Sequence, residues 1–234
     1  MASFVEQQTL LSILLIADPK ILAIPIIDNH EPMIDLREQN EIVYGPSPEI
    51  PNNTDYTKMR QTVYEKLKQA QSLLPAGLRL CLYESYRSLG LQKMLFDTRF
   101  AKIKNQHPDW SSEQLFTKTI RMVSPVINQD GSANIPPHAT GAAVDVYLID
   151  EQGEALDMGI HPKDWMDDVD GTLSLTTSTI ISRAAKQHRK ILTAAMSSAG
   201  FVNYGHEYWH WSYGDRYWAY YQHQPHAVYD RYQE

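Results

Sequence analysis

Cysteine is nearly absent from this 234-residue chain, which has only Cys81. One cysteine excludes an internal disulfide and a thiolate cluster for a metal. Because Cys81 lies in the apolar run 78–83, we expect it to be buried like a small hydrophobic residue. Any metal site must then be built from histidine, aspartate and glutamate.

Basic residues are also scarce: 21 Lys and Arg stand against 28 Asp and Glu, and none form a run. The formal net charge of −7 argues against a surface for nucleic acid or an anionic membrane. The apolar stretch 10–16 follows only Glu6 and ends before Asp18 and Lys20. It therefore lacks the basic start of a secretory signal and the length of a membrane span. We expect a cytoplasmic protein in which this stretch forms a packed helix.

Internal repeats, linkers and low-complexity segments are missing as well, so we expect one domain over 1–234, with 1–30 as a packed helix-and-strand extension. Hydrophobic spacing and breakers predict helices at 56–74, 89–105, 112–123 and 179–199. Ser111 and Gln114 form a plausible capping box, and Gly200 a C-terminal cap. Strands are expected at 21–30, 78–83, just after His138, 201–204 and 208–213. This order predicts an α+β fold with a small, mainly antiparallel central sheet flanked by helices.

The stretch 136–148 combines a turn-forming start with a strand that carries a carboxylate. His138 precedes Gly141, a glycine that lets the chain turn back, and Asp145 then lies between apolar strand residues. A buried carboxylate needs a cation or a metal, and imidazole plus carboxylate suits zinc. The alternative is a loop histidine and a hydrogen-bonded strand aspartate without a ligand.

A second stretch, 205–211, carries Glu207 and His210 three positions apart. Such residues point to opposite faces of an ideal strand, so they can converge only if the chain turns, which Gly205 would allow. His210 would complete three zinc ligands with His138 and Asp145 and leave one position for water. Glu207 would be the general base that activates the zinc-bound water.

Arg87, at the end of the strand 78–83, is a candidate for stabilising the oxyanion of a peptide-bond hydrolysis. The alternatives are that Arg87 only pairs with Glu84 and that the aromatic segment 208–213 is only core.

The segments from His138 to Asp145, from Glu207 to His210 and from Glu84 to Arg87 together resemble the zinc D-alanyl-D-alanine dipeptidases, the VanX-like group of the M15 peptidases. The resemblance covers roughly residues 40–220 in the same order. It implies zinc ligation by His138, Asp145 and His210, catalysis by Glu207 and Arg87, and the fold shared with D,D-carboxypeptidases and the hedgehog signalling domain.

The resemblance also implies one zinc ion per chain and a small dipeptide substrate, without fixing an oligomeric state. Tyr86 and Trp209 are its candidate substrate contacts. Three departures stand out: Tyr208 replaces a tryptophan of the family, Pro136 replaces a serine, and the run after Gly159 is altered. Asp164 is the replacement for the family's ammonium-binding aspartate, with Asp167 and Asp168 as rivals. Alternative functions are a carboxypeptidase for longer peptidoglycan peptides and a non-catalytic zinc-bearing binding module.

Overall fold

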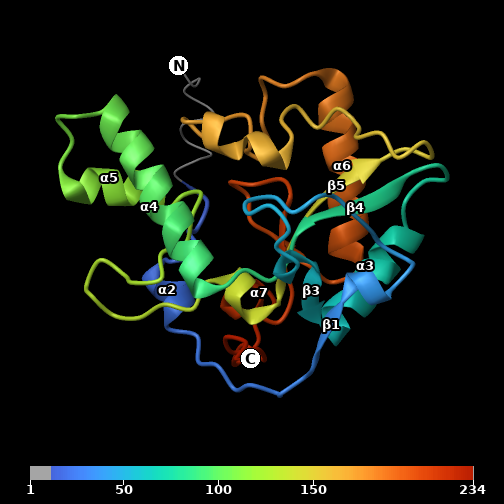
Figure 1. Ribbon diagram of the computed structural model, residues 1–234, viewed down its shortest axis with the longest axis horizontal. Helices are drawn as coiled ribbons and strands as arrows, with labels where there is room; N and C mark the ends of the chain where they lie inside the picture. The colour runs from blue at the N-terminus through green and yellow to red at the C-terminus, as the bar shows by residue number, and fades with distance from the viewer. Residues whose placement is uncertain (1–11, 234) are drawn as a thin grey trace.

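A five-stranded sheet crosses the centre of the computed structural model, which describes residues 12–233 (Figure 1). Its strand order is β2 (Val43–Tyr44), β4 (Arg79–Glu84), β5 (Ala143–Ile149), β7 (His210–Ser212) and β6 (Val202–Asn203). Only the pairing of β2 with β4 is parallel. A second, antiparallel pair joins β1 (Met33–Asp35) and β3 (Lys58–Arg60). The predicted α+β fold with a mainly antiparallel sheet is confirmed.

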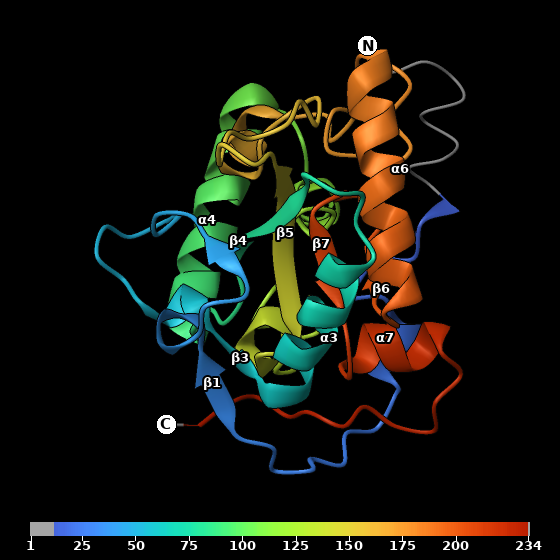
Figure 2. The same cartoon turned by 90° about the vertical axis from the view of Figure 1, so that its right-hand side faces the viewer.

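Helices cover both faces of the sheet (Figure 2). On one face lie α3 (Gln61–Ser72) and α6 (Arg183–Ser198); on the other lies α4 (Leu89–Gln106), which packs on α5 (Ser112–Thr119). The short elements are α2 (Pro19–Leu22), α7 (Arg216–Tyr221) and four 3-10 turns, η1 (Leu36–Glu38), η2 (Asp55–Thr57), η3 (Pro137–Thr140) and η4 (Pro162–Asp167). No helix in the described range has the length and apolar character to cross a membrane.

Strand β5 is buried along its whole length and divides the interior into two environments. Val144, Val146 and Leu148 belong to the main hydrophobic core, together with residues of α3 and α6. Because strand side chains alternate, Asp145 and Tyr147 point to the opposite face. There Tyr147 packs in a separate cluster with Cys81, which is buried as predicted. Asp145 therefore lies on the face of β5 away from the core that α3 and α6 cover.

The N-terminal elements differ from their prediction. The predicted helix at 10–16 lies partly outside the described residues, and residues 13–18 are not helical. The predicted edge strand at 21–30 is wrong: Asp18 caps the short helix α2 and Pro19 occupies its first turn. After α2 the chain forms one isolated bridge, between Ile26 and Ala227, with a few backbone hydrogen bonds around it. Aspartate followed by proline is a helix start, and this signal outweighs the apolar run.

Three predicted helices are shorter than their hydrophobic spacing suggested. Helix α6 begins at Arg183, after its N-cap Ser182, rather than near residue 179. Helix α3 begins at Gln61 rather than near residue 56, because residues 58–60 pair with β1. Helix α5 ends at Thr119, but its Ser111–Gln114 capping box is present on both sides. Gly200, with φ +94°, follows α6 as predicted.

Two buried arginines hold the irregular segment 157–176 through its backbone. Arg99 on α4 donates to the carbonyl oxygens of Met166 and Asp168 at 2.9 and 2.8 Å. Arg189 on α6 donates to those of Met158, Leu173 and Leu175. A guanidinium group carries five N–H donors in one plane, so a single arginine can bind several backbone carbonyl oxygens at once. The segment is thus fixed to two helices on opposite faces of the sheet.

Candidate active site

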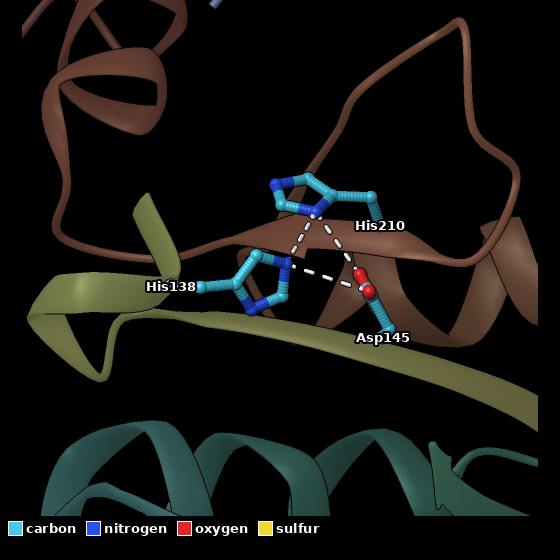
Figure 3. Close-up of side chains that lie close together, drawn as sticks. All are labelled: His138, Asp145 and His210. Atoms are coloured by element: carbon cyan, nitrogen blue, oxygen red, sulfur yellow. Dashed lines mark hydrogen bonds and ion pairs between the residues drawn. The ribbon is translucent and has the colours of Figure 1, made fainter. Parts of the chain in front are cut away.

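Three side chains from separate elements meet on the buried face of the sheet: His138 on η3, Asp145 on β5 and His210 on β7 (Figure 3). Antiparallel pairing sets Asp145 directly opposite His210. Asp145 Oδ1 lies 3.0 Å from His210 Nδ1, and Asp145 Oδ2 lies 3.4 Å from His138 Nε2. The nitrogen atoms His138 Nε2 and His210 Nδ1 are 3.1 Å apart. The structure thus brings together the predicted ligand set.

The spacing of these donor atoms fits a tetrahedral metal ion. Zinc bonds to nitrogen and oxygen at about 2.0–2.2 Å, so two ligands of a tetrahedral site lie about 3.3–3.6 Å apart. The three observed separations are within a few tenths of an ångström of that range. The three side chains are also 3 to 6 % exposed. Burial raises the pKa of Asp145, but the two neighbouring histidines outweigh it and lower the pKa overall. An ionised carboxylate beside two imidazoles is a donor set that zinc prefers.

Hydrogen bonds orient His138 toward its neighbours. Its Nδ1 lies 2.6 Å from the carbonyl oxygen of Ser85, which can only accept, so Nδ1 carries the proton and Nε2 keeps its lone pair. The backbone N–H of Arg87 donates to the carbonyl of His138 at 3.2 Å. Gly141 ends η3 with φ +71°, and a Cβ there would lie 2.5 Å from Met33 Sδ. The expected reversal at Gly141 is therefore present.

Two consecutive turns bring Glu207 to the same site. Glu207 N–H donates to Tyr204 O at 2.8 Å, and His210 N–H donates to Glu207 O at 3.2 Å. Asn203 braces both turns by donating to the carbonyl oxygens of Glu207 and His210. As a result, Glu207 Oε2 lies 4.0 Å from His210 Nδ1. Burial, followed by the charge of Asp145, raises the pKa of Glu207 well above its usual value.

Gly205 contributes to these turns for a reason that differs from the prediction. The backbone angle φ of Gly205 is not positive, so any residue type could adopt this conformation and the turn does not need glycine's conformational freedom. A Cβ at this position would instead lie 3.0 Å from Ile13 Cδ1. The missing side chain lets the N-terminal segment pack against the turn that carries Glu207.

Arg87 pairs with Glu84 and also lines the pocket, so the pairing does not remove it from the site, and its catalytic role stays a prediction. Arg87 Nε donates to Glu84 Oε1 at 3.0 Å, Arg87 Nη2 donates to Glu84 Oε2, and Arg87 Nη1 donates to Gln92 Oε1 at 2.9 Å. The Glu84 side chain is 1 % exposed and that of Arg87 is 11 % exposed. The pair thus fixes the guanidinium at the edge of the cavity.

One pocket contains Glu207, Arg87 and the three proposed ligands, and Trp209 also lines it. The other predicted substrate contacts lie outside its lining. Tyr86 packs edge-to-face on Tyr232, with ring centroids 5.7 Å apart, and Asp164 is exposed on η4. Both remain predictions as substrate contacts.

The other positions singled out in the sequence have structural surroundings of their own. Tyr208 is buried, donates to the carbonyl of Ile160 at 2.7 Å and packs on Arg189, with its guanidinium carbon 4.1 Å from the ring centroid. It does not line the pocket, whereas Pro136 does. Asp167 pairs with Lys102, and Asp168 accepts from the backbone N–H of Ser174.

Several residues in or beside the pocket carry no local sequence signal. Trp165 and Ile16 line the pocket, and Glu49 accepts from Trp165 Nε1 at 3.3 Å. Burial, followed by the charge of Glu84, raises the pKa of Glu49. Burial, followed by the charge of Glu49, raises the pKa of the pocket residue Tyr83. In the sequence, Glu49 lies in the stretch 44–55, whose composition indicates only a loop. Its contact with Trp165 could therefore be found only in the tertiary structure.

Comparisons with known proteins agree on one family. The peptidase M15 family model, described as D-ala-D-ala dipeptidase, matches residues 53–230. A D-alanyl-D-alanine dipeptidase of Synechocystis sp. is 27% identical over 231 residues, covering 88% of this chain and 91% of the relative. A D-alanyl-D-alanine dipeptidase of Escherichia coli is 29% identical over 140 residues, covering 58% of this chain and 55% of the relative.

Two solved structures overlay less closely. VanYB in complex with D-alanine-D-alanine is 14% identical, with a TM-score of 0.44 over 85% of this chain and 92% of that chain. A VanY D,D-pentapeptidase mutant in complex with Zn(II) is 18% identical, with a TM-score of 0.42 over 80% of this chain and 91% of that chain.

Proposed function

The chain belongs to the peptidase M15 family of D-Ala-D-Ala dipeptidases, and from this membership we propose that it hydrolyses D-Ala-D-Ala, or a close analogue, with one zinc ion per chain. The observation that carries the proposal is the meeting of His138, Asp145 and His210 in one pocket with Glu207. A site that only bound zinc for structure would not need a buried carboxylate beside its ligands.

His138 Nε2, His210 Nδ1 and a carboxylate oxygen of Asp145 would hold the metal. A bound zinc ion would act as a Lewis acid and make water a better nucleophile at neutral pH. Ser85, through its carbonyl, holds the His138 tautomer that this role requires.

Glu207 would move the proton. Its carboxylate accepts a proton from the attacking water and then donates it to the amine nitrogen that leaves the cleaved peptide bond. Glu207 Oε2 lies 4.0 Å from His210 Nδ1, so this carboxylate is beside the proposed ligands, where it could accept the proton of the attacking water and return it.

Arg87 would stabilise the oxygen that becomes negative when water attacks the carbonyl carbon. Its guanidinium is fixed by Glu84 and Gln92 before any substrate binds. Such preorganised charge avoids the cost of rearrangement during the reaction.

The substrate's ammonium group would need a carboxylate near the pocket. Glu49 is a candidate beside the Asp164 expected from the sequence. Glu49 is half-buried and accepts a hydrogen bond from the pocket residue Trp165, and its described contacts include no ion pair, whereas Asp164 is exposed. A dipeptide ammonium would supply the missing positive charge.

The test is release of D-alanine from D-Ala-D-Ala by zinc-loaded protein, with N-acetyl-D-Ala-D-Ala alongside. We expect cleavage of the free dipeptide only, and a loss of about 10²–10⁴-fold in kcat for Glu207→Gln with zinc still bound. Cleavage of the blocked dipeptide would support a carboxypeptidase for longer peptides. Absence of turnover on both by zinc-loaded protein would support a binding module.

A further inference from the structure

An N-terminal wall segment, residues 13–22, forms part of the catalytic pocket, although it precedes the stretch that the family model matches. Ile16 is the residue of this segment that lines the pocket, where it lies with Tyr204, Glu207 and His210. Ile16 as a whole residue is 9 % exposed. Ile120 and Met122 also line the pocket, so its lining combines apolar side chains with the polar Arg87 and Gln92.

The N-terminal wall segment is anchored on β6, α7 and the Glu207 turn. Ile16 and Ile21 form a small cluster with Tyr204 and Tyr217. Tyr217 Oη donates to Leu14 O at 3.3 Å, and Asp18 N–H donates to Leu15 O at 3.0 Å. Ile13 occupies the space that a side chain at Gly205 would take. These contacts hold Ile16 in place against the catalytic turn.

A second cavity lies behind Ile16. It is lined by Ile16, Ile21, Leu22 and Tyr217 among others, mostly with apolar atoms. Ile16 and Pro137 are the residues that the two cavities share. Truncating Ile16 would therefore extend the catalytic pocket into an apolar space that already exists.

We propose that Ile16 is a specificity-determining residue, which limits the substrate to small side chains by closing the pocket toward the second, apolar cavity; this rests on the proposed dipeptidase activity. The group that meets this wall is a methyl group of the substrate, since an apolar wall receives an aliphatic chain. A hydrophobic pocket discriminates between one methylene more or less by roughly 10–200-fold, so shortening Ile16 should relax the limit by a similar factor.

The experiment compares kcat/KM for D-Ala-D-Ala, D-Ala-D-Leu and D-Leu-D-Ala with zinc-loaded wild type, Ile16→Ala and Ile16→Val. The matched control is Ile21→Ala, which shortens a buried isoleucine of the same cluster that lines the second cavity but not the catalytic pocket. Binding of the three dipeptides is also measured by calorimetry in the Glu207→Gln background, so that the result does not depend on turnover.

We expect Ile16→Ala to raise the ratio of one leucine dipeptide to D-Ala-D-Ala by about tenfold or more, in kcat/KM and in affinity. Ile16→Val should also raise this ratio, but by a smaller factor. This variant tests the proposal even if Ile16→Ala does not fold. Ile21→Ala should leave the ratio within about twofold of wild type. Unchanged ratios in both Ile16 variants, or an equal change in Ile21→Ala, would overturn the role of Ile16. Wild type that neither binds nor cleaves D-Ala-D-Ala would instead refute the proposed function.

Discussion

Replacing Arg87 with methionine should damage both stability and catalysis, and the two effects can be separated. The guanidinium is held by two bonds to Glu84 and one to Gln92. Since the Glu84 side chain is only 1 % exposed, Arg87→Met leaves a carboxylate buried without its cation. Breaking a buried pair on one side costs about 3–5 kcal/mol of unfolding free energy. For a chain of this length, the midpoint of thermal unfolding should fall by roughly 10 °C.

A second substitution removes the stranded charge. In Glu84→Gln/Arg87→Met no ion is left unpaired, so the double variant should recover at least half of the lost unfolding free energy. Its activity should not recover, because the charge that faces the developing oxyanion is still missing. We expect kcat to stay about 10²–10³-fold below wild type in both variants.

The measurements are denaturant unfolding and D-alanine release, made on zinc-loaded wild type, both single variants and the double variant. Near-wild-type kcat in the double variant would mean that Arg87 serves only to neutralise Glu84. An Arg87→Met protein as stable as wild type would refute the assignment of a buried, energetically coupled pair.

Three further predictions concern the metal, the substrate and the pH. Asp145→Ala should not retain zinc through dialysis, and full metal stoichiometry in that variant would contradict the ligand set. Glu49→Gln should raise KM for D-Ala-D-Ala about tenfold through loss of a charged hydrogen bond, while Asp164→Asn stays within about twofold; the opposite ranking would assign the ammonium to Asp164. Burial, followed by Arg121 and Lys118, lowers the pKa of His206 to about 3. Because the unfolded chain takes up this proton near pH 6.5, the unfolding free energy should fall on the order of 1 kcal/mol per pH unit from about 6.5 toward 3. His206→Phe should lose that part of the slope in denaturant titrations, and an unchanged slope would show that His206 is not the group.

The proposed metal ligands could be read from the sequence because each belongs to a short pattern with its own chemistry. Asp145 alternates with valines, so a carboxylate in an apolar strand was visible without tertiary information. His210 and Glu207 required a turn, and the sequence predicted that turn but gave the wrong reason for Gly205. The meeting of Asp145 with His210 depends on the register in which β5 pairs with β7, and His138 joins them from η3, which precedes β5.

The rest of the pocket could not be predicted in this way, because it is made by distant segments. Ile16 looks like any other apolar residue of a short N-terminal run, and Glu49 lies among prolines and glycine that indicate only a loop. Their positions depend on packing against Tyr204 and Trp165, which are far away in the sequence. The start of α3 was misplaced for a related reason: Met59 fits the helical spacing, but pairing with β1 determines its conformation.

The attachment of segment 157–176 through Arg99 and Arg189 has a consequence for how this enzyme family can diversify. Every acceptor in these bonds is a backbone carbonyl, and all amino acids possess one. Substitutions in the segment can therefore alter the side chains near the pocket, such as Trp165, while the anchoring bonds persist. The two arginines, by contrast, cannot be exchanged for lysine without losing several donors. Sequence drift should accordingly concentrate in the segment and spare the two helix positions that hold it.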